Sequence, residues 1–367
     1  MNYKISKESV IPAYLQLYNQ IKEHIVNGVY PFDGKLPSKR FLAEETEVSI
    51  ITVEHAYSML CEEGYIEGKE RSGYFVKFRS SDGFATAPKE HIKHNKSTSF
   101  QSVDYPKFPV SVLGKAIRKV TADLDEDILK PSPNFGCVEL REAIQKYLER
   151  SRNITVTIEQ IIIGSGAEYL YGLLLKLFGR KRIYAIEVPS YQKIEQVYLA
   201  EGVTIEKLKL GSDGIESAML QATKASILHI SPYSSFPSGV SASLAKRQEY
   251  LRWVDADDRY IIEDDFESEF SVARHVEPTV YSMALKDNVI YMNTFSQTIS
   301  PSLRVGYMVL PKALVDVFQE KIGFYSCTVP TFIQYVLAEL IDGGNFERHI
   351  NRVRRQKRKE LNRLKSK

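Results

Sequence analysis

Residues 291–307 decide how the fold of the whole chain is interpreted. Their sequence is Tyr291-Met292-Asn293-Thr294-Phe295-Ser296-Gln297-Thr298-Ile299-Ser300-Pro301-Ser302-Leu303-Arg304-Val305-Gly306-Tyr307. The pattern predicts a strand, a polar loop and a second strand. The loop carries hydroxyl groups at Thr294, Ser296 and Thr298, followed by the guanidinium of Arg304. Both kinds of group donate hydrogen bonds to anionic oxygens, so the stretch suits a bound phosphate. An ordinary turn rich in serine and threonine is the alternative.

Composition places the chain among globular proteins. Its 367 residues favour two domains, and 43% hydrophobic and 11% aromatic residues are enough for a sizeable core. No apolar run is long enough to span a bilayer and no basic-then-apolar leader is present, so we expect a cytoplasmic protein with no membrane partner. Cys61, Cys137 and Cys327 lack metal-ligand spacing, so we expect reduced thiols and no metal site.

The net charge of +3 is unevenly distributed. Residues 348–367 contain ten lysines or arginines and one acid, which leaves a balance of −6 for the remainder. The spacing predicts a basic amphipathic helix. A solvated helix face is the favoured interpretation, and contact with nucleic acid or a membrane is the alternative.

Residues 1–79 show three helical stretches followed by two short alternating ones. The first helix ends at Gly28. Ser38 is a candidate N-cap for a second helix that runs to Glu45, and Ser49 for a third that ends at Gly64. The predicted buried stripes are Tyr14, Leu17, Tyr18, Ile21 and Ile25 in the first helix and Val53, Ala56, Tyr57 and Leu60 in the third. Three helices followed by a hairpin form a winged helix-turn-helix.

This segment resembles the DNA-binding domain of the GntR family. The residues that carry the likeness are 36–43, 48–49, 52–53, 56–57, 60, 63–66 and 72–76. In such domains the third helix enters the major groove, while the wing and the start of the second helix reach phosphates. The resemblance therefore implies DNA contacts from Lys39, Arg40, Ser49, Thr52, His55 and Arg71.

Two departures bear on that implication. The family usually has an arginine where Ile50 stands, and residues 1–79 hold ten basic and eleven acidic side chains. We therefore expect modest, salt-sensitive affinity for DNA that depends on dimerisation. A winged helix used only for protein contacts is the alternative.

Residues 80–105 are polar, with few apolar side chains, and predict a flexible linker. Beyond it, residues 106–367 alternate short apolar runs with helical stretches. The predicted strands are residues 161–163, 183–186, 204–210, 227–230, 260–263, 289–291 and 305–310. This is an α/β pattern with a mostly parallel sheet buried on both faces, and ligands bind beyond the carboxyl ends of such strands.

The segment 106–367 resembles the fold-type I enzymes that use pyridoxal phosphate (PLP), in the version found in MocR-type regulators of the GntR superfamily. The motifs that carry the likeness are residues 134–144, 164–167, 189–191, 231–239, 263–270 and 291–307. By resemblance the loop at residues 164–167 holds the cofactor phosphate, and Asp264 pairs with the pyridine nitrogen. A solvated acidic loop is the alternative for Asp264 and Asp265. The implied cofactor-binding residues are Ser165, Gly166, Ala167, Tyr191, Asp264, Phe266, Ser296, Gln297 and Arg304.

Three departures separate the chain from a PLP enzyme. Gln297 stands where the family has the lysine that forms the Schiff base, and an amide nitrogen cannot form an imine. Phe266 replaces the tyrosine whose hydroxyl bonds the cofactor's phenolic oxygen. The chain stops at Lys367, before the family's small C-terminal subdomain. We therefore expect a truncated aminotransferase-like domain with no catalytic residue.

The combined expectation is a homodimeric transcriptional regulator that binds a double-stranded DNA operator. Its aminotransferase-like domain serves dimerisation and binds a small-molecule effector or non-covalent PLP. An aminotransferase-like enzyme is disfavoured because transamination needs the lysine as nucleophile and as base. An interaction protein that sequesters paralogues is the other alternative. The residues leave open the operator, the effector, the direction of regulation and whether Gln297 is natural or engineered.

Overall fold

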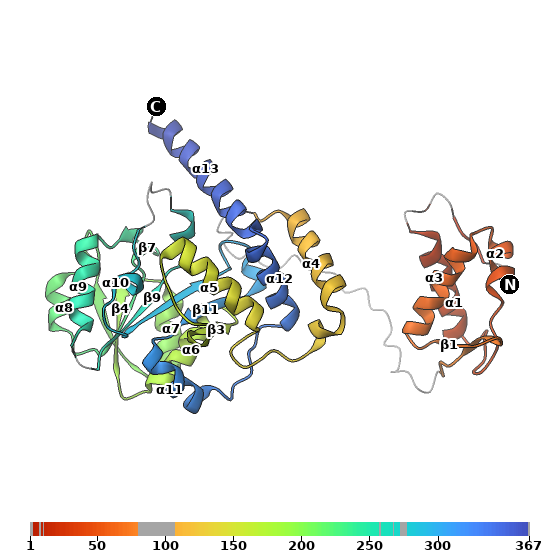
Figure 1. The fold of residues 1–367 in the computed structure, drawn as a ribbon, viewed down its shortest axis with the longest axis horizontal. Coiled ribbons are helices and arrows are strands. Elements are labelled where there is room, and N and C mark those ends of the chain that lie inside the picture. The colour runs from red at the N-terminus through yellow and green to blue at the C-terminus, as the bar shows by residue number, and fades with distance from the viewer. Residues whose placement is uncertain are drawn as a thin grey trace. The chain divides into compact units, whose positions relative to one another are not determined.

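The computed structural model describes residues 3–6, 9, 11–79, 107–256, 258–266, 268–271 and 277–365. The chain divides into two compact units, Met1–Phe100 and Gln101–Lys367 (Figure 1). The linker expected at residues 80–105 lies outside the described residues, and the boundaries 1–79 and 106–367 stay predictions. No helix in the described part of the chain is long and apolar enough to cross a membrane.

The first unit has three helices followed by a hairpin within residues 11–79. The elements are α1 (Ala13–Val26), α2 (Lys39–Thr46), α3 (Ile50–Glu62), β1 (Ile66–Lys69) and β2 (Gly73–Val76). Ser38 accepts a hydrogen bond from the Phe41 amide and Ser49 from the Thr52 amide, so both predicted N-caps are present. The hairpin pairs Ile66 with Val76 in antiparallel register. The winged-helix prediction is confirmed.

The core of this unit follows the predicted stripes, with one exception. Val53, Ala56, Tyr57 and Leu60 are all fully buried, as are Leu17 and Ile21. Tyr14 is only half-buried, because it lies in the first turn of α1 and stacks on the His55 ring at a centroid distance of 4.1 Å.

The second unit is built on a seven-stranded sheet in the order β3-β11-β10-β9-β6-β4-β5. Its strands are β3 (Ile161–Gly164), β4 (Ile183–Val188), β5 (Thr204–Lys209), β6 (Ile227–Ile230), β9 (Tyr260–Asp264), β10 (Val289–Thr294) and β11 (Gly306–Val309), and a separate hairpin joins β7 (Tyr233–Ser235) to β8 (Val240–Ser241). All pairings of the large sheet are parallel except the two made by β11. The predicted mostly parallel α/β fold is confirmed.

Helices cover both faces of this sheet (Figure 1). They are α4 (Val110–Leu124), α5 (Val138–Arg152), α6 (Ala167–Phe178), α7 (Gln192–Ala200), α8 (Ser217–Ala222), α9 (Leu244–Val254), α10 (Val280–Met283), α11 (Lys312–Ile322), α12 (Thr331–Asp342) and α13 (Asn345–Lys365). Ile161 and Ile163 pack in the core beneath α4, α5, α12 and α13, whereas Ile162 packs in the core beneath α6, α7 and α11. Successive side chains of a strand point to opposite faces, so both faces are apolar.

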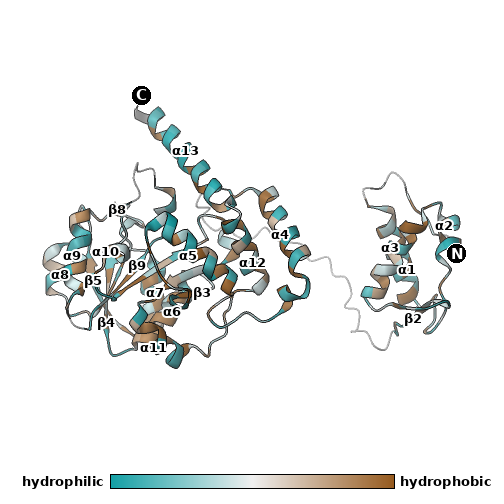
Figure 2. Cartoon of the chain, in the orientation of Figure 1, coloured by the Kyte–Doolittle hydropathy of each residue, from teal (hydrophilic) through white to brown (hydrophobic). Residues whose placement is uncertain are grey.

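The last helix, α13, contains most of the basic segment expected at residues 348–367. Its buried face consists of Phe346, His349, Ile350 and Val353, and its side chains are exposed from Arg355 to Arg363. Figure 2 shows α13 as predominantly hydrophilic, with its end projecting from the unit.

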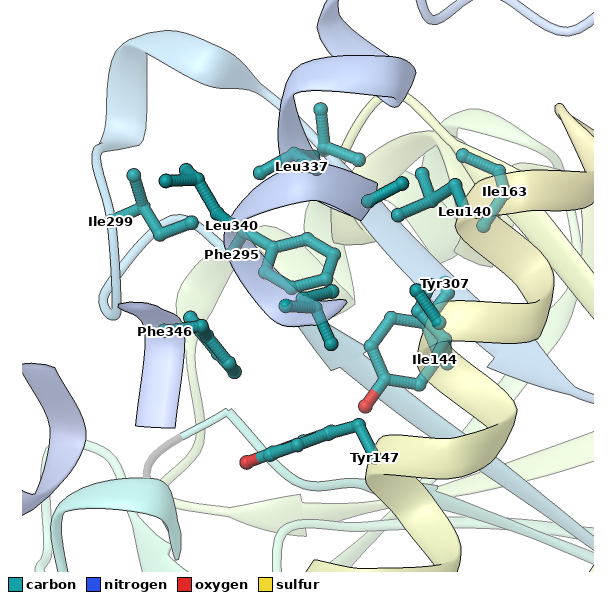
Figure 3. Packing of buried hydrophobic residues seen from close by; sticks show 14 of the residues in the cluster. Leu140, Ile144, Tyr147, Ile163, Phe295, Ile299, Tyr307, Leu337, Leu340 and Phe346 are labelled. Carbon is teal, nitrogen blue, oxygen red and sulfur yellow. The ribbon is translucent and has the colours of Figure 1, made fainter. Parts of the chain in front are cut away.

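Phe346 anchors α13 to the rest of the second unit (Figure 3). Its ring lies 5.2 Å from the Tyr147 ring of α5 and 5.6 Å from the Phe295 ring, both edge-on. Phe295 follows β10 directly and is 2% exposed. The first turn of α13 therefore packs against Phe295, at the start of the loop that carries Gln297.

We predict that Phe346→Ala lowers the free energy of unfolding by about 3–5 kcal/mol, because it removes a buried ring and leaves a cavity. Urea denaturation of the second unit measures the change. Leu361→Ala on the same helix is the control, because Leu361 is 42% exposed, and its effect should stay within about 0.5 kcal/mol. Equal losses in the two variants would show that Phe346 does not anchor the helix.

Candidate functional sites

The start of α3 presents two of the predicted DNA-contacting hydroxyls. The Ser49 Oγ atom lies 3.1 Å from the Thr52 amide nitrogen and 2.8 Å from Thr52 Oγ1. The cap therefore fixes both side chains in the first turn, where recognition helices contact base edges and phosphates.

The start of α2 carries two cations, of which one is already paired. The Lys39 Nζ atom lies 2.5 Å from Glu54 Oε1 on α3, and this hydrogen bond raises the pKa of Lys39. Arg40 beside it is exposed. A DNA phosphate must displace Glu54 to reach Lys39, whereas Arg40 needs no such exchange. The sequence reasoning missed Glu54, because a pair 15 residues apart forms only when α2 packs on α3.

Arg71 and His55 lie where the sequence places them. Arg71 is exposed in the turn of the hairpin with a φ of 58°. His55 is exposed on α3, with its ring on Tyr14.

Exposed apolar side chains share this surface. Ile50 and Ile51 open α3 and are 47% and 76% exposed, and Phe41 on α2 is 57% exposed. The sequence reasoning gave Ile50 no use, because an isoleucine cannot bind phosphate. A signal was available, since Ile51 lies off the buried stripe that begins at Val53. Apolar side chains at such a position suit the C5-methyl group of thymine in the major groove.

In the second unit, Gly166 and Arg304 come together beyond the carboxyl end of β3. Gly166 has a φ of +90° and precedes α6, and a Cβ atom placed on it would lie 3.6 Å from Arg304 Cζ. Arg304 follows the turn Pro301–Leu303 with a left-handed φ of 51°. A helix start beside a guanidinium is an anion-binding arrangement. Ser165 is held by a 2.9 Å hydrogen bond to Thr328.

Glu168 on α6 sets the charge of this arrangement. Its carboxylate lies 3.1 Å from Arg304 Nη2 and 3.2 Å from Lys193 Nζ. Partial burial raises the pKa of Glu168, but the hydrogen bonds from Lys193 and Arg304 outweigh that effect and lower it. One acid between two cations leaves the cluster net positive, as a phosphate site requires.

Asp264 ends β9 and is 3% exposed. The Tyr171 hydroxyl on α6 donates a hydrogen bond to its Oδ2 atom, and His229 Nε2 on β6 lies 3.6 Å from the same atom. The other oxygen, Oδ1, is buried with no hydrogen-bond partner among the described residues. Burial and the Asp264 charge raise the pKa of Tyr171 far above its usual value, so Tyr171 stays protonated. Asp264 is therefore oriented through one carboxylate oxygen, and its other oxygen is a buried acceptor without a partner among the described residues.

A second tyrosine, Tyr198, contacts the other ring nitrogen of His229. The Tyr198 hydroxyl lies 2.8 Å from His229 Nδ1. The acceptor-only carboxylate facing Nε2 favours the tautomer with the proton on Nε2, so Tyr198 donates to Nδ1. The sequence reasoning missed Tyr171, Tyr198 and His229, although a histidine inside the apolar run of β6 was a signal.

The remaining predicted residues lie at the same edge of the sheet. Ser296 and Gln297 are half-buried in the turn after β10, and Phe266 is half-buried two residues after β9 ends. Tyr191 caps α7 and is 37% exposed, with its ring 6.4 Å from Phe236. Ala167 is the first residue of α6.

Two families match this chain. Residues 13–76 match the bacterial regulatory proteins of the gntR family, and residues 96–367 match the class I and II aminotransferases. The uncharacterised HTH-type transcriptional regulator YdeL of Bacillus subtilis is 33% identical over 95% of this chain and 78% of its own length. The chain belongs to the MocR-type GntR regulators.

Further comparisons agree with that architecture. The probable rhizopine catabolism regulatory protein MocR of Rhizobium meliloti is 28% identical over 96% of this chain and 76% of its own length. The kynurenine aminotransferase of Pyrococcus horikoshii, solved in complex with PMP, matches with a TM-score of 0.63 and 24% identity. That match covers 68% of this chain and spans 65% of the aminotransferase, and it shows the fold alone.

In this MocR-type chain two acids that follow Asp264, Asp265 and Glu269, are structural. Asp265 is fully buried and accepts hydrogen bonds from the Tyr291 hydroxyl at 2.7 Å and the Ser268 amide at 3.2 Å. Arg152 Nε lies 3.4 Å from Asp265 Oδ2, and its Nη2 lies 3.7 Å from Glu269 Oε1. The alternative of a solvated acidic loop at Asp264 and Asp265 is wrong, because both are buried and partnered.

A further buried carboxyl, Glu187, is the penultimate residue of β4 in the same MocR-type domain. It is 3% exposed and accepts hydrogen bonds from the Ser231 amide at 3.1 Å and the Ser235 hydroxyl at 2.9 Å. Burial raises the pKa of Glu187 to about 7, with a smaller contribution from the Asp264 charge, and the two hydrogen bonds oppose the rise.

We predict that Glu187 makes stability depend on pH. Its folded-state pKa of about 7 lies above the ordinary value of 4.5, so the folded protein holds the proton more tightly than the unfolded chain. This contribution is complete below about pH 4.5 and is lost as the pH rises to about 7, a change of about 3 kcal/mol. Glu187→Gln removes that dependence. Urea unfolding at pH 4.5 and pH 8 measures it, with Leu361→Ala as a control that removes no titratable group. The same pH dependence in both variants would refute the assignment.

Proposed function

We propose that this chain is a cytoplasmic, homodimeric, DNA-binding transcriptional regulator whose aminotransferase-like domain has no transaminase activity. The observation that carries the proposal is the winged helix with exposed hydroxyl and basic groups at the starts of α2 and α3. It precedes an aminotransferase-like domain in the same order as in relatives named transcriptional regulators.

Binding begins at phosphates. Arg40 and Arg71 are exposed at the start of α2 and the wing tip, and each supplies one phosphate contact. Lys39 adds a third contact only after it leaves Glu54. Few contacts per head give weak binding, so two heads on one operator supply the useful affinity.

Sequence is then read at the start of α3. With Ile50 and Ile51 exposed there, hydrogen bonding to guanine is not available from these positions. Their methyl groups instead pack on the C5-methyl groups of thymine, which favours A·T pairs opposite this turn. Ser49 and Thr52 supply the polar contacts.

Two variants separate these contributions. Arg40→Gln should weaken binding to all duplexes alike and reduce the slope of log K against log salt by about one, because one phosphate contact is lost. Ile51→Ala should leave the salt slope unchanged and lose the preference for thymine over uracil, which lacks the methyl group. Fluorescence anisotropy on duplexes from the chain's own upstream region, with thymine or uracil at each position, measures both.

Lys22→Gln is the matched control, because it removes one charge from α1, where Lys22 pairs with Glu63 at 3.0 Å. Its salt slope should equal that of the unmodified chain. No sequence-specific binding by a confirmed dimer would refute the regulator. A winged helix used for protein contacts would then be the better description.

The proposal includes non-covalent binding of PLP at the strand ends. The residues fit two parts of that cofactor, because Asp264 Oδ1 is an unpartnered buried acceptor for the ring nitrogen and Gly166 with Arg304 suits the phosphate. In this proposal Ser165, Ala167 and Ser296 contact the phosphate, and Tyr191 and Phe266 contact the cofactor ring. PMP in the kynurenine aminotransferase supports this class of ligand.

The residues do not fit covalent attachment at the family's position, since Gln297 carries no amine. Bound PLP supplies an electron sink, but only a base and a nucleophile turn that property into transamination. Here Tyr171 and His229 orient Asp264, and Arg304 and the start of α6 hold an anion. These groups bind and orient a ligand without moving a proton on it.

We predict that the chain binds PLP reversibly. Calorimetry should detect binding, and borohydride treatment followed by mass spectrometry of the intact protein should show no covalent adduct. Arg304→Gln should weaken binding roughly tenfold to a hundredfold, because a charge-assisted hydrogen bond to the phosphate is lost. Arg180→Gln is the control, because Arg180 is exposed before β4 begins, at the other end of the strand.

The outcomes are distinct. A covalent adduct in the unmodified chain would show that another lysine has replaced the missing one, and the inactive assignment would be wrong. No binding would restrict the second unit to dimerisation or to another ligand.

A further inference from the structure

A pocket of about 550 Å³ lies between the start of α4 and the first half of α13. This volume is within the range of sites for small organic molecules. One wall is apolar and consists of Phe108, Pro109 and Val112. The opposite wall consists of α13 side chains, and among the described lining residues none is an acid or carries a hydroxyl.

Three arginines of α13 line this pocket. Arg348, Arg352 and Arg355 follow one another at four and three residues, so they lie on one face of the helix. Like charges at this spacing destabilise a helix. Within the described residues none of the three forms an ion pair, and their protein acceptors are main-chain oxygens, the Asn345 side chain and the His349 ring.

A neighbouring arginine differs from these three. Arg150 on α5 lies 2.8 Å from Glu347 on α13 and forms an ion pair with it. Arg348, Arg352 and Arg355 therefore bring three cations without ion-pair partners among the described residues to one pocket.

His349 forms the inner part of the basic wall. It is 3% exposed, and its ring lies 4.8 Å from Phe108. Burial lowers the pKa of His349 to about 4, with the Arg352 charge acting in the same direction and the main chain of Thr298 in the opposite one. The ring is neutral at pH 7. Arg352 Nη2 lies 2.9 Å from Nδ1, and arginine only donates, so Nδ1 accepts and Nε2 carries the proton. Nε2 is buried without a hydrogen-bond partner among the described residues.

We propose that this pocket binds an organic anion, with a carboxylate or phosphate group on the arginines and an apolar body against Phe108, Pro109 and Val112. Three guanidinium groups present donors only, and the described lining holds no carboxylate, so the complementary group is one that only accepts. A fully hydrated inorganic ion leaves the apolar wall uncovered. An anion with an aromatic or aliphatic body covers both walls.

Two residues of α13 connect the pocket to the loop that carries Gln297. The His349 ring interacts with the main chain of Thr298. Phe346, one turn earlier on α13, packs on Phe295. A ligand at this pocket therefore acts on the strand-end site through α13. Its role as an effector rests on the proposed regulator function, whereas its binding does not and is measured separately.

Calorimetry with the full chain tests the proposal, using phenyl phosphate and benzoate as probes. Inorganic phosphate and phenol are the comparisons that lack the body or the charge. Both organic anions should bind at least tenfold more tightly than phosphate or phenol. Arg352→Gln and, separately, Arg355→Gln should each weaken the probes roughly tenfold, because each removes one charge-assisted contact. Both side chains are exposed, so the substitutions disturb no packing.

Two controls locate the probe. Lys359→Gln removes one exposed charge from the same helix outside the pocket and should change nothing. Arg180→Gln removes an exposed charge away from both proposed sites and should also change nothing. Loss of probe binding in Arg304→Gln together with full binding in Arg352→Gln would place the probe at the strand ends and overturn the proposal. Equal binding in Arg352→Gln and the unmodified chain would overturn it too. So would displacement of the probe by DNA of arbitrary sequence, which would assign these arginines to nucleic acid phosphates. Failure of operator binding by the head leaves the result of this test intact.

Discussion

The second unit depends on one buried cation. Arg152 is 4% exposed and lies between Asp265 and Glu269, two carboxylates that are themselves buried. Without a counter-charge, the run after β9 could not enter the protein, since an isolated buried carboxylate is strongly unfavourable. With Arg152 in place the run folds inward and Asp265 is fully satisfied. Asp264 is then left at the strand end with one oxygen oriented by Tyr171 and the other buried without a partner among the described residues. The same pairing that stabilises the fold thus creates the part of the site that can accept a ligand.

Local patterns predicted the elements of both units, because each depends on neighbours in sequence. Ser38 and Ser49 cap helices whose first turns follow them directly, and the apolar runs of β6 and β9 are buried on both faces as parallel strands require. Asp264 was identified because a carboxylate ends an apolar run. The family resemblance implied that it pairs with the pyridine nitrogen of PLP. Its actual neighbours were not predictable, because Tyr171 lies 93 residues away and reaches Asp264 only after α6 has packed on the sheet.

In an aminotransferase-like fold, the groups that bind a ligand differ from the groups that catalyse its conversion. Holding a phosphate and a ring nitrogen requires a helix start, a guanidinium and an oriented carboxylate, and those requirements are met around Gly166, Arg304 and Asp264. Moving a proton requires a base, and Gln297 has an amide that is neither a base nor a nucleophile. Under the proposed function the site therefore distinguishes ligands without converting them. For a regulator that is an advantage, since a ligand that is not consumed can report its own concentration at equilibrium.

Helix α13 connects that strand-end site to the outside of the domain. Its apolar face is fixed by Phe346 against Phe295 and Tyr147, so the first turns cannot slide without disturbing the Gln297 loop. Its arginine face carries repulsion that the described residues do not neutralise. A ligand shifts a conformational equilibrium only by the difference in its affinity for the two states. An anion that relieves the repulsion stabilises the α13 position in which the three guanidinium groups converge. Because Phe346 packs on Phe295, a helix held in that position also holds the Gln297 loop. This effect acts through side-chain packing and needs no change in the sheet.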